Sequence, residues 1–359
     1  MEKIIDQYIR EVYLKVSPLH SEQYAYQSGK STETAIHSLT TKLEKALGGK
    51  EIALCSSIDI QGAFDNASFR SIDEAMIRKG IPKMITKWIL NMLENRLVIY
   101  ETGAKRLIIR STKGCPQGGV LSPLLWLMVI NELITFLDEL GYEVQGFADD
   151  LETMVRGRFD STVAERMQLA LDTSLNWCRE KGLTINPNKT TIVPFTRRRK
   201  FDLGTLRLGE TVLSFSEEMK YLGVILDRTL TWNNHISYIT KKALRVTFTC
   251  QRLYGKTWGL RPKMMAWSYK TLIVPMITYA SLAWWPKVEQ VKAQAVLNRI
   301  HRVACLCVTG AIRTCPTAAL GMLTGLTPLH LTFKRTAACA ALWLPNLYQM
   351  KDTMSCGRR

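Results

Sequence analysis

Two adjacent carboxylates, Asp149 and Asp150, stand in the tetrapeptide Phe147-Ala148-Asp149-Asp150. Extended sequence on both sides of the tetrapeptide predicts a β-hairpin with both acids at its tip. A third acid, Asp59, ends another apolar strand. Three such carboxylates can hold two Mg²⁺ ions, an arrangement suited to in-line phosphoryl displacement. Exposed hairpin tips often carry Asp without a catalytic role, so the interpretation depends on the elements around the pair.

The strand that leads to Asp59, predicted over Glu51 to Ile60, has two different faces. Side chains alternate between the faces of a strand, so large residues share one face and small residues share the other with Asp59. The large residues are Ile52, Leu54, Ile58 and Ile60, and the small ones are Ala53, Cys55 and Ser57. We expect the first face to pack in the core and the second to lie open for a ligand. The carboxylates of Asp59 and Asp149 should then lie about 4–6 Å apart, close enough to share metal ions.

The remaining pattern alternates between helices and short strands. Capping residues, apolar repeats and terminal Gly or Pro predict helices from Ser31 or Thr32 to Gly48, from Phe69 to Gly80, and over residues 83–95, 122–140 and 160–181. Short strands are predicted around residues 97–100 and 107–110 and around the tetrapeptide Asn186-Pro187-Asn188-Lys189. This order predicts an α+β fold, in which an antiparallel sheet packs on helices.

Positive charge dominates the composition. The chain has 48 Lys and Arg against 31 Asp and Glu, a net charge of +17, which favours a polyanionic partner such as nucleic acid. From about Thr240 the chain is helical, and basic and aromatic side chains interleave in a way that suits contact with phosphates, bases and sugars. They are Lys241, Lys242, Arg245, Phe248, Arg252, Tyr254, Lys256, Trp258, Trp267 and Tyr269. We take Lys241, Lys242 and Arg245 as candidate nucleic-acid contacts. A core of aromatic helices with a solvated edge fits these residues equally well.

Several classes of protein are disfavoured. The nine cysteines are scattered without a Cys-x-x-Cys pattern, which fits a reducing compartment better than a disulfide framework. The first ten residues are charged and lack the apolar core of a secretory signal. The longest apolar run, Val120 to Ile130, contains Pro123 and is well short of the roughly 20 residues that span a bilayer. We therefore expect an intracellular protein of the nucleus or cytoplasm, neither secreted nor embedded in a membrane.

Several ordered segments together resemble the reverse transcriptase of non-LTR retrotransposons, the LINE-type elements of the Jockey and I-factor kind. The resemblance covers most of the chain, from about Gln23 to about Pro328. It rests on segments similar to polymerase motifs A to E, which are Ser57-Ile-Asp-Ile-Gln-Gly-Ala-Phe-Asp65, Pro116-Gln117-Gly118, Phe147-Ala-Asp-Asp150, Gly182-Leu-Thr-Ile-Asn-Pro-Asn-Lys189 and Tyr221-Leu222-Gly223. Residues 27–32 resemble a fingers motif, and residues 269–285 resemble the thumb-side segment of these elements.

The resemblance implies a right-hand polymerase fold with a palm, partial fingers and a helical thumb-side region. Residues 1–50 correspond to truncated fingers, and residues 51–200 to the palm with part of the fingers, carrying motifs A to D. Residues 201–239 correspond to a palm–thumb connection with a primer-grip-like hairpin. Residues 240–359 correspond to a helical thumb and a C-terminal linker region. Because the family's fingers begin earlier, we expect a fragment or a degenerate copy of a larger polyprotein.

The same resemblance implies roles for individual residues. Two Mg²⁺ ions, with Mn²⁺ as an alternative, would be held at Asp59, Ile60 and Asp149, while Asp150 supports the site. Lys189 would protonate the leaving pyrophosphate or stabilise its charge. The nucleotide-binding positions correspond to Lys30, Phe64, Gln117 and Gly118, and the primer grip corresponds to Tyr221, Leu222 and Gly223. The Phe64 ring would lie beneath the sugar 2′ position. Without the family, Lys189 would be interpreted as a solvated residue and Phe64 as a core residue.

These roles imply an RNA-directed DNA polymerase that transfers a nucleotide from a dNTP to a primer 3′-hydroxyl, with an RNA template and a DNA primer as partners. The alternative is a catalytically inactive remnant of the same fold that only binds nucleic acid. The fingers motif favours it, because Lys30 stands at the second basic position and Tyr26-Gln27 replaces the usual Gly-Phe-Arg stretch. An RNA-dependent RNA polymerase is disfavoured, because such enzymes usually have a polar residue at Phe64 and glycine at Ala148.

Overall fold

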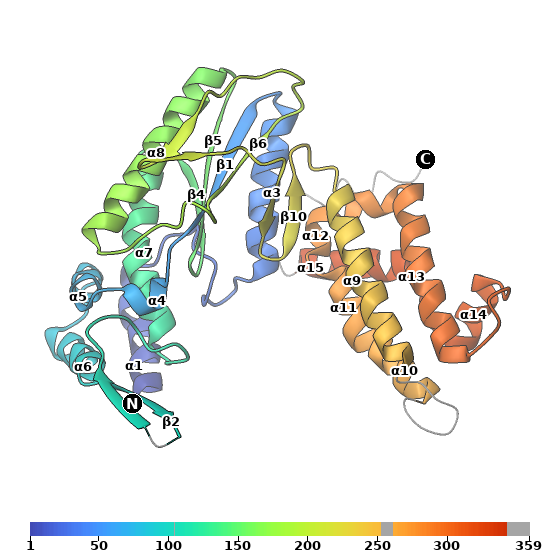
Figure 1. Cartoon of the computed structure of the whole chain (residues 1–359), viewed down its shortest axis with the longest axis horizontal. Helices are drawn as coiled ribbons and strands as arrows, with labels where there is room; N and C mark the ends of the chain where they lie inside the picture. The colour runs from blue at the N-terminus through green and yellow to red at the C-terminus, as the bar shows by residue number, and fades with distance from the viewer. Residues whose placement is uncertain (104, 253–260, 343–359) are drawn as a thin grey trace. The chain divides into compact units, whose positions relative to one another are not determined.

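The computed structural model describes residues 1–103, 105–252 and 261–342 (Figure 1). Contacts divide the chain into two units. Unit 1 contains Met1–Ala35 and Lys42–Met219, and unit 2 contains Ile36–Thr41 and the chain from Lys220 onward. Three of the interleaved basic and aromatic residues lie outside the described residues, namely Tyr254, Lys256 and Trp258.

The centre of unit 1 is a four-stranded antiparallel sheet in the order β4-β5-β1-β6. Its strands are β4 (Glu143–Phe147), β5 (Asp150–Gly157), β1 (Ile52–Asp59) and β6 (Thr191–Phe195). A two-residue turn joins β4 to β5, and β5 pairs with β1 along its whole length. The hairpin that carries the paired acids therefore lies directly beside the strand that carries the third. The expected antiparallel sheet with helices packed on it is confirmed.

Helices pack on both faces of this sheet. Figure 1 shows α7 (Ser122–Glu139) and α8 (Asp160–Glu180) on one side and α3 (Thr32–Gly48) on the other. The mostly apolar α7 packs between β4 and α5 (Phe69–Arg78), which buries most of its side chains. Ser31 is the N-cap of α3, because its hydroxyl accepts a hydrogen bond from the Thr34 N–H. The four helices begin and end within two residues of the predicted positions.

The face of β1 that carries small residues is not open, contrary to our expectation. Ala53 and Cys55 have no exposed surface. Gln145 of β4, which points to the same face, donates a hydrogen bond to the Ala35 carbonyl of α3 at 2.9 Å. The side chains are small here because a helix packs against them, and not because a ligand lies along the strand. Only the end of this face, at Ser57 and Asp59, stays partly accessible.

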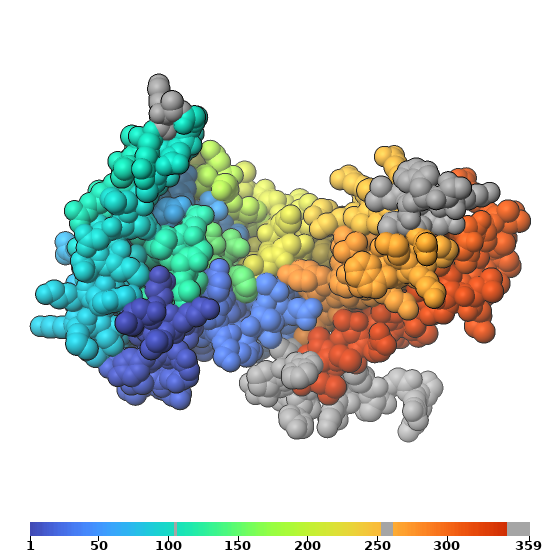
Figure 2. Space-filling view, turned by 90° about the horizontal axis from the view of Figure 1, so that it is seen from below, coloured from blue at the N-terminus to red at the C-terminus, as the bar shows by residue number. Residues whose placement is uncertain are grey.

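Two surface segments of unit 1 extend beyond what the sequence predicted. The first residues form α1 (Glu2–Tyr8), a π-helix (Ile9–Tyr13) and α2 (Leu14–Val16). Glu2 accepts hydrogen bonds from the N–H groups of Val120 and Leu121, just before α7. Figure 2 shows this N-terminal segment on the surface. The hairpin of β2 (Leu97–Thr102) and β3 (Lys105–Arg110) is longer than predicted and projects from unit 1.

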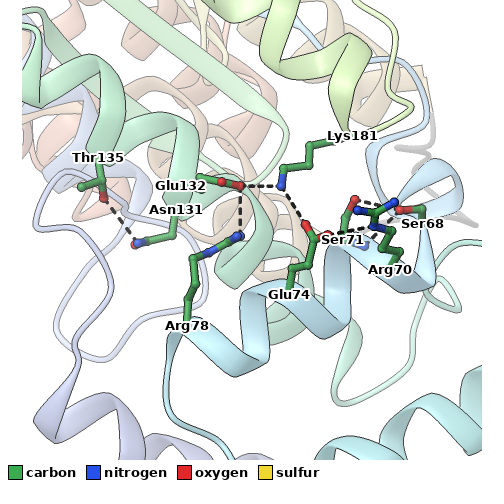
Figure 3. Close-up of polar contacts among 9 residues, drawn as sticks. All are labelled: Ser68, Arg70, Ser71, Glu74, Arg78, Asn131, Glu132, Thr135 and Lys181. Carbon is green, nitrogen blue, oxygen red and sulfur yellow. Dashed lines mark hydrogen bonds and ion pairs between the residues drawn. The ribbon is translucent and has the colours of Figure 1, made fainter.

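An ion-pair network joins α5, α7 and the end of α8 (Figure 3). Lys181, which follows α8, has its Nζ 3.0 Å from Glu74 Oε2 and 3.0 Å from Glu132 Oε2. Arg78 Nη2 lies 2.9 Å from the same Glu132 oxygen. Only 11% of the Lys181 side chain is exposed, so solvent screens these pairs less than it screens most surface pairs. The network holds the point at which the chain leaves α8 for the tetrapeptide that ends at Lys189.

Unit 2 is mostly helical. Its long helices are α9 (Asn233–Arg252), α13 (Val291–Thr309) and α15 (Leu329–Leu342). Trp284 is buried among them, with its ring centroid 4.3 Å from that of Phe333 and 5.2 Å from that of His235. None of the helices in the described ranges combines the length and the apolar character that crossing a bilayer requires.

Candidate active site

The strand register brings the three acids to one end of the sheet. Asp59 stands directly opposite Asp150 in the β1–β5 pair, and Asp149 precedes Asp150 in the turn. Residues opposite each other in an antiparallel pair have Cβ atoms about 4.5–5.5 Å apart on the same face. The hairpin beside Asp59 is confirmed with one correction, because only Asp149 lies at the tip and Asp150 already belongs to β5. The separation of the Asp59 and Asp149 carboxylates stays a prediction.

The turn that carries Asp149 has an uncommon backbone conformation. Ala148 has a φ of +58°, in the left-handed region that residues other than glycine seldom adopt. Trp126 of α7 is buried, and its Nε1 donates a hydrogen bond to the Ala148 carbonyl at 2.8 Å. Such strain persists only where surrounding contacts enforce it. The position of Asp149 therefore depends on α7 as well as on the hairpin.

The three acids concentrate negative charge. Burial, followed by the charges of Asp149 and Asp59, raises the pKa of Asp150 to about 6. Lys189 brings a positive charge close to them, since its Nζ lies 3.3 Å from Asp59 Oδ2. Lys189 is largely exposed, so solvent screens this pair and the acids stay only partly compensated. A divalent cation would relieve the remaining repulsion, and hard carboxylate oxygens are the ligands that Mg²⁺ prefers.

The arrangement differs from the expected cluster of three carboxylates around the ions. Within the described ranges, no three His, Cys, Asp or Glu side chains lie together in a geometry that could hold a metal ion. Asp59 pairs instead with Lys189. The smaller set implied by the resemblance, Asp59 and Asp149 with Ile60, fits Mg²⁺ better, because this ion usually binds one or two carboxylates plus substrate phosphates and water. The hydrocarbon side chain of Ile60 has no ligand atom, so only its main-chain oxygen can serve.

A tight turn brings Lys189 to the acids. The Asn186 N–H donates to the Asp59 carbonyl at 3.0 Å, which joins the turn to the end of β1. Asn186 Oδ1 accepts from the Asn188 N–H at 3.1 Å, and the Asn186 carbonyl accepts from the Lys189 N–H at 3.2 Å. Asn side chains commonly close turns in this way. These hydrogen bonds explain physically why Lys189 lies beside Asp59, while its part in proton transfer stays a prediction.

The segment after Asp59 is fastened to the loop before α7. The Cys115 N–H donates to the Phe64 carbonyl at 2.7 Å, and the Gly114 N–H donates to the same segment at 2.8 Å. Gln117 Nε2 donates to Asp65 Oδ2 at 2.9 Å. A carboxylate accepts only from the amide nitrogen, so Asp65 determines which way the Gln117 amide points. From the sequence we assigned no role to Asp65, although it ends the motif A segment, or to Gly114, which lies two residues before the motif B segment.

Gly114 makes this close approach feasible. Its φ is +82°, and a Cβ added there would collide with the main chain of Asp65, whereas at Gly204, with φ +60°, an added Cβ meets nothing within 4 Å. We expect Gly114→Ala to lower the free energy of unfolding by at least about 2 kcal/mol more than Gly204→Ala. Both variants share the backbone strain, and only the first adds a main-chain clash. Urea denaturation measures the difference, and equal losses would show that the loop moves aside at little cost.

Phe64 and Gly118, two predicted nucleotide contacts, differ in their surroundings: Phe64 is partly packed in the core and Gly118 is open to solvent. Phe64 is half-buried, with its ring centroid 6.0 Å from that of Trp126, and it packs against the core. The same Trp126 holds Ala148, so one helix positions both the Phe64 ring and the Asp149 turn. Gly118 is exposed, has φ +85° and leaves open space where a Cβ would stand. Contact of either residue with a nucleotide stays a prediction.

Lys30 is engaged in its own loop. Its Nζ donates to the main-chain carbonyls of Ser21 and Gln23 and lies 5.1 Å from the centroid of the Tyr24 ring. Burial lowers the pKa of Lys30, with the charge of Glu22 opposing that shift. A phosphate contact would require Lys30 to leave these partners, so its role in nucleotide binding stays a prediction.

Glu152, which sequence reasoning also missed, is buried two residues beyond Asp150. Burial first, and then the charge of Asp150, raises its pKa from 4.5 to about 8, although Ser57 Oγ donates to its Oε1 at 2.6 Å. Between these two values the folded protein retains a proton that the unfolded chain has released. Glu152 therefore contributes stability that is lost as the pH rises through that window.

We expect Glu152→Gln to remove this pH dependence. The variant should gain stability relative to the wild type as the pH rises from about 5 to about 8. Urea denaturation across that range, without divalent ions, measures the difference. Glu139→Gln removes an exposed carboxyl of α7 and should leave the wild-type pH dependence in place. Parallel curves for wild type and Glu152→Gln would mean that Glu152 is ionised in the folded protein.

The family model for reverse transcriptase (RNA-dependent DNA polymerase) matches residues 1–226. The chain belongs to the reverse transcriptase family. The match includes the residues before Gln23, for which the sequence offered no motif. Relatives include the retrovirus-related Pol polyprotein of the type-1 retrotransposable element R1 of Bradysia coprophila, which is 29% identical over 93% of this chain. The RNA-directed DNA polymerase of the mobile element jockey of Drosophila melanogaster is 24% identical over 78% of this chain.

These relatives confirm the resemblance to non-LTR retrotransposon reverse transcriptases. The chain spans about a third of their length, 33% of the R1 polyprotein and 30% of the jockey polymerase. Solved structures of the same fold include telomerase from Candida albicans, with a TM-score of 0.51 at 10% identity over 90% of this chain and 58% of that one. Apo telomerase from Candida tropicalis has a TM-score of 0.51 at 11% identity over 99% and 61%. The chain therefore has the reverse transcriptase and telomerase fold.

The residues predicted to form the primer grip lie at the end of β9 (Glu218–Tyr221) and in the turn that follows it in unit 2. Tyr221 is buried, Leu222 has φ +45° and Gly223 has φ +86°. The Tyr279 hydroxyl donates to the Leu222 carbonyl at 2.9 Å. Tyr279 belongs to the segment that resembles the thumb side of the family, so the structure brings these two sequence-predicted features together. Contact with a primer stays a prediction.

The basic and aromatic residues after Thr240 divide between core and surface. Lys241, Lys242 and Arg245 are all exposed on α9, as nucleic-acid contacts must be. Among the aromatic residues, Tyr269 is buried, whereas Phe248 and Trp267 are exposed. Burial of Tyr269 fits the alternative of an aromatic core, and contact of the exposed residues with nucleic acid stays a prediction.

Proposed function

We propose that this chain copies RNA into DNA by two-metal nucleotidyl transfer from a dNTP to a primer 3′-hydroxyl. The observation that carries the proposal is the group formed by Asp59, the Asp149–Asp150 hairpin and Lys189 at the accessible end of the sheet. An RNA template, a DNA primer and a dNTP are the proposed partners. The relatives that carry the name RNA-directed DNA polymerase support the same reaction.

The proposed mechanism gives each residue one task. Asp59 and Asp149, with the Ile60 carbonyl, would hold two Mg²⁺ ions, or Mn²⁺ instead. Bound ions would lower the pKa of the 3′-hydroxyl and offset charge on the pyrophosphate. Lys189 would neutralise or protonate that leaving group, and Asp150 would support the turn. These tasks rest on the positions described above and await kinetic measurement.

Nucleotide and primer contacts complete the proposal. Phe64 would limit the space at the sugar 2′ carbon, and Gln117, oriented by Asp65, would position the nucleotide or template. Gly118 would allow close approach to the main chain, and Lys30 would contact the triphosphate after leaving its loop. The turn of Tyr221, Leu222 and Gly223 would hold the primer end.

The finer division of the chain also belongs to the proposal. Fingers would occupy residues 1–50, and the palm with part of the fingers residues 51–200. The palm–thumb connection would occupy residues 201–239, and the helical thumb and linker residues 240–359. The division between units at Met219 and Lys220 falls inside the proposed connection.

The second candidate function is an inactive remnant that only binds nucleic acid. The engagement of Lys30 with main-chain carbonyls favours it, because fingers need free cations to hold a triphosphate. Primer extension on an RNA template with dNTPs and Mg²⁺ separates the two candidates. Extension that requires all three supports the polymerase. Binding of an RNA–DNA hybrid without extension, in both Mg²⁺ and Mn²⁺, would refute it and favour the remnant.

A further inference from the structure

The excess positive charge of the chain resides entirely in unit 2. Residues 1–219 contain 28 Lys and Arg and 28 Asp and Glu, whereas residues 220–359 contain 20 Lys and Arg and 3 Asp and Glu. Within the described residues of unit 2 the acids are Asp227 and Glu289. Asp227 is buried and accepts hydrogen bonds from Thr231 and Trp232 N–H groups, and Glu289 pairs with Lys334 at 3.0 Å. Neither acid is free to compensate other cations.

Four of the unit 2 cations line one groove. It lies along α9 and α13 and has a volume of about 660 Å³. Lys241 comes from α9, Lys287 from the short helix η3 (Trp285–Glu289), and Lys292 and Arg299 from α13. No carboxylate lines the groove, and none of the four cations forms an ion pair or a side-chain hydrogen bond within the described residues. The groove therefore concentrates uncompensated positive charge.

The other lining groups are suited to an anion as well. Asn233, the first residue of α9, and Gln290, which precedes α13, both line the groove. The dipole at the start of a long helix adds partial positive charge. Amide side chains add further hydrogen-bond donors. These features reinforce the four cations and do not replace them.

The spacing of the cations requires an extended anion. Lys292 and Arg299 are seven residues apart on α13, which corresponds to about 10 Å at 1.5 Å per residue. A single phosphate or carboxylate cannot contact both ends of such a row, whereas successive phosphates of a polynucleotide can. Lys242 and Arg245, the other candidates on α9, are not among the residues that line the groove.

We propose that this groove binds the phosphodiester backbone of a nucleic acid, with Lys241, Lys287, Lys292 and Arg299 contacting successive phosphates. The choice of a polynucleotide over another polyanion rests on the proposed polymerase function, for which nucleic acid is the substrate. The sequence did not indicate the other three cations, Lys287, Lys292 and Arg299. They lie some 50 residues beyond Lys241 in the sequence and come near it because α13 packs on α9.

Binding of a labelled RNA–DNA hybrid to the full chain at several salt concentrations tests the proposal. Each phosphate contact contributes about 0.9 to the slope of log affinity against log salt. The variant Lys292→Gln with Arg299→Gln should therefore lower the slope by about 2 and weaken binding at least roughly fivefold near 0.1 M salt. Lys241→Arg keeps the charge and should keep the wild-type slope.

The matched control is Lys263→Gln with Arg313→Gln. It removes the same charge from two exposed residues of unit 2 outside the groove, and its slope should match the wild type. Equal weakening by both double variants would show that only net charge matters and would overturn the proposal. The proposal would also be overturned if the groove variant unfolded at the wild-type temperature and kept the wild-type salt slope.

Competition identifies the kind of polyanion. Single-stranded RNA, the RNA–DNA hybrid, polyglutamate and anionic phospholipid vesicles are compared at equal charge. The proposal is supported if either nucleic acid competes for the wild type and this competition is lost in the groove variant. Comparing the two nucleic acids distinguishes single-strand binding from duplex binding. Equal competition by polyglutamate or vesicles overturns it. Binding is measured without catalysis, so the two proposals can fail separately. A wild type that binds through the groove but does not extend a primer would refute the polymerase function and leave the groove proposal standing.

Discussion

Asp149→Asn should abolish primer extension, with a loss of at least roughly a thousandfold, or about 4 kcal/mol of barrier. The substitution keeps the size of the side chain and removes the charge that would hold a divalent cation. Asp149 lies exposed at the tip of the β4–β5 turn, so the change should leave packing intact. Single-nucleotide extension on an RNA template measures the loss, and thermal unfolding checks the fold.

Two neighbouring variants sharpen this result. Asp150→Asn should cost less than about a hundredfold, since Asp150 is half-buried in β5 and supports the turn rather than holding metal. Glu139→Gln removes an exposed carboxyl elsewhere in unit 1 and should leave extension unchanged. Asp149→Asn should bind the RNA–DNA hybrid at least as well as the wild type, because a negative charge near the phosphates is lost. Full extension by Asp149→Asn would remove the two-metal proposal.

Phe64→Ala should change the choice of sugar. If the exposed part of the ring packs under C2′ of the incoming nucleotide, a ribose hydroxyl collides with it and the variant opens that space. We expect the variant to incorporate ribonucleotides at least roughly tenfold better relative to deoxynucleotides, judged by the ratio of kcat/KM values. Phe64→Tyr keeps the ring and should keep the wild-type ratio.

Packing effects must be separated from this change. Phe64 contacts Trp126, so its truncation should also cost about 1–3 kcal/mol of stability and some overall rate. Phe69→Ala truncates another partly buried Phe that packs on the same core and should cost stability without altering the sugar ratio. An unchanged ratio in Phe64→Ala would identify Phe64 as an ordinary core residue.

The sequence alone determined the elements that carry the acids. Alternation over Glu51 to Ile60 predicted β1, extended sequence around the tetrapeptide predicted the hairpin, and caps with apolar repeats predicted the helices that pack on the sheet. These patterns depend on neighbours within a few residues, which is why they can be recognised without tertiary structure. Family motifs then located Lys189 and Gln117, although the patterns themselves offered no reason for either.

Only the tertiary structure decided which surfaces are covered and which residues meet. Alternation showed that β1 has a face of small residues, but whether a ligand or a helix covers that face depends on α3. The bond between Gln117 and Asp65 joins residues 52 positions apart, and no spacing in the sequence encodes it. The same holds for buried Glu152 and for the four cations of the groove. Hydrophobic periodicity specifies which side of an element is buried, whereas the partner on that side is chosen by the packing of the whole chain.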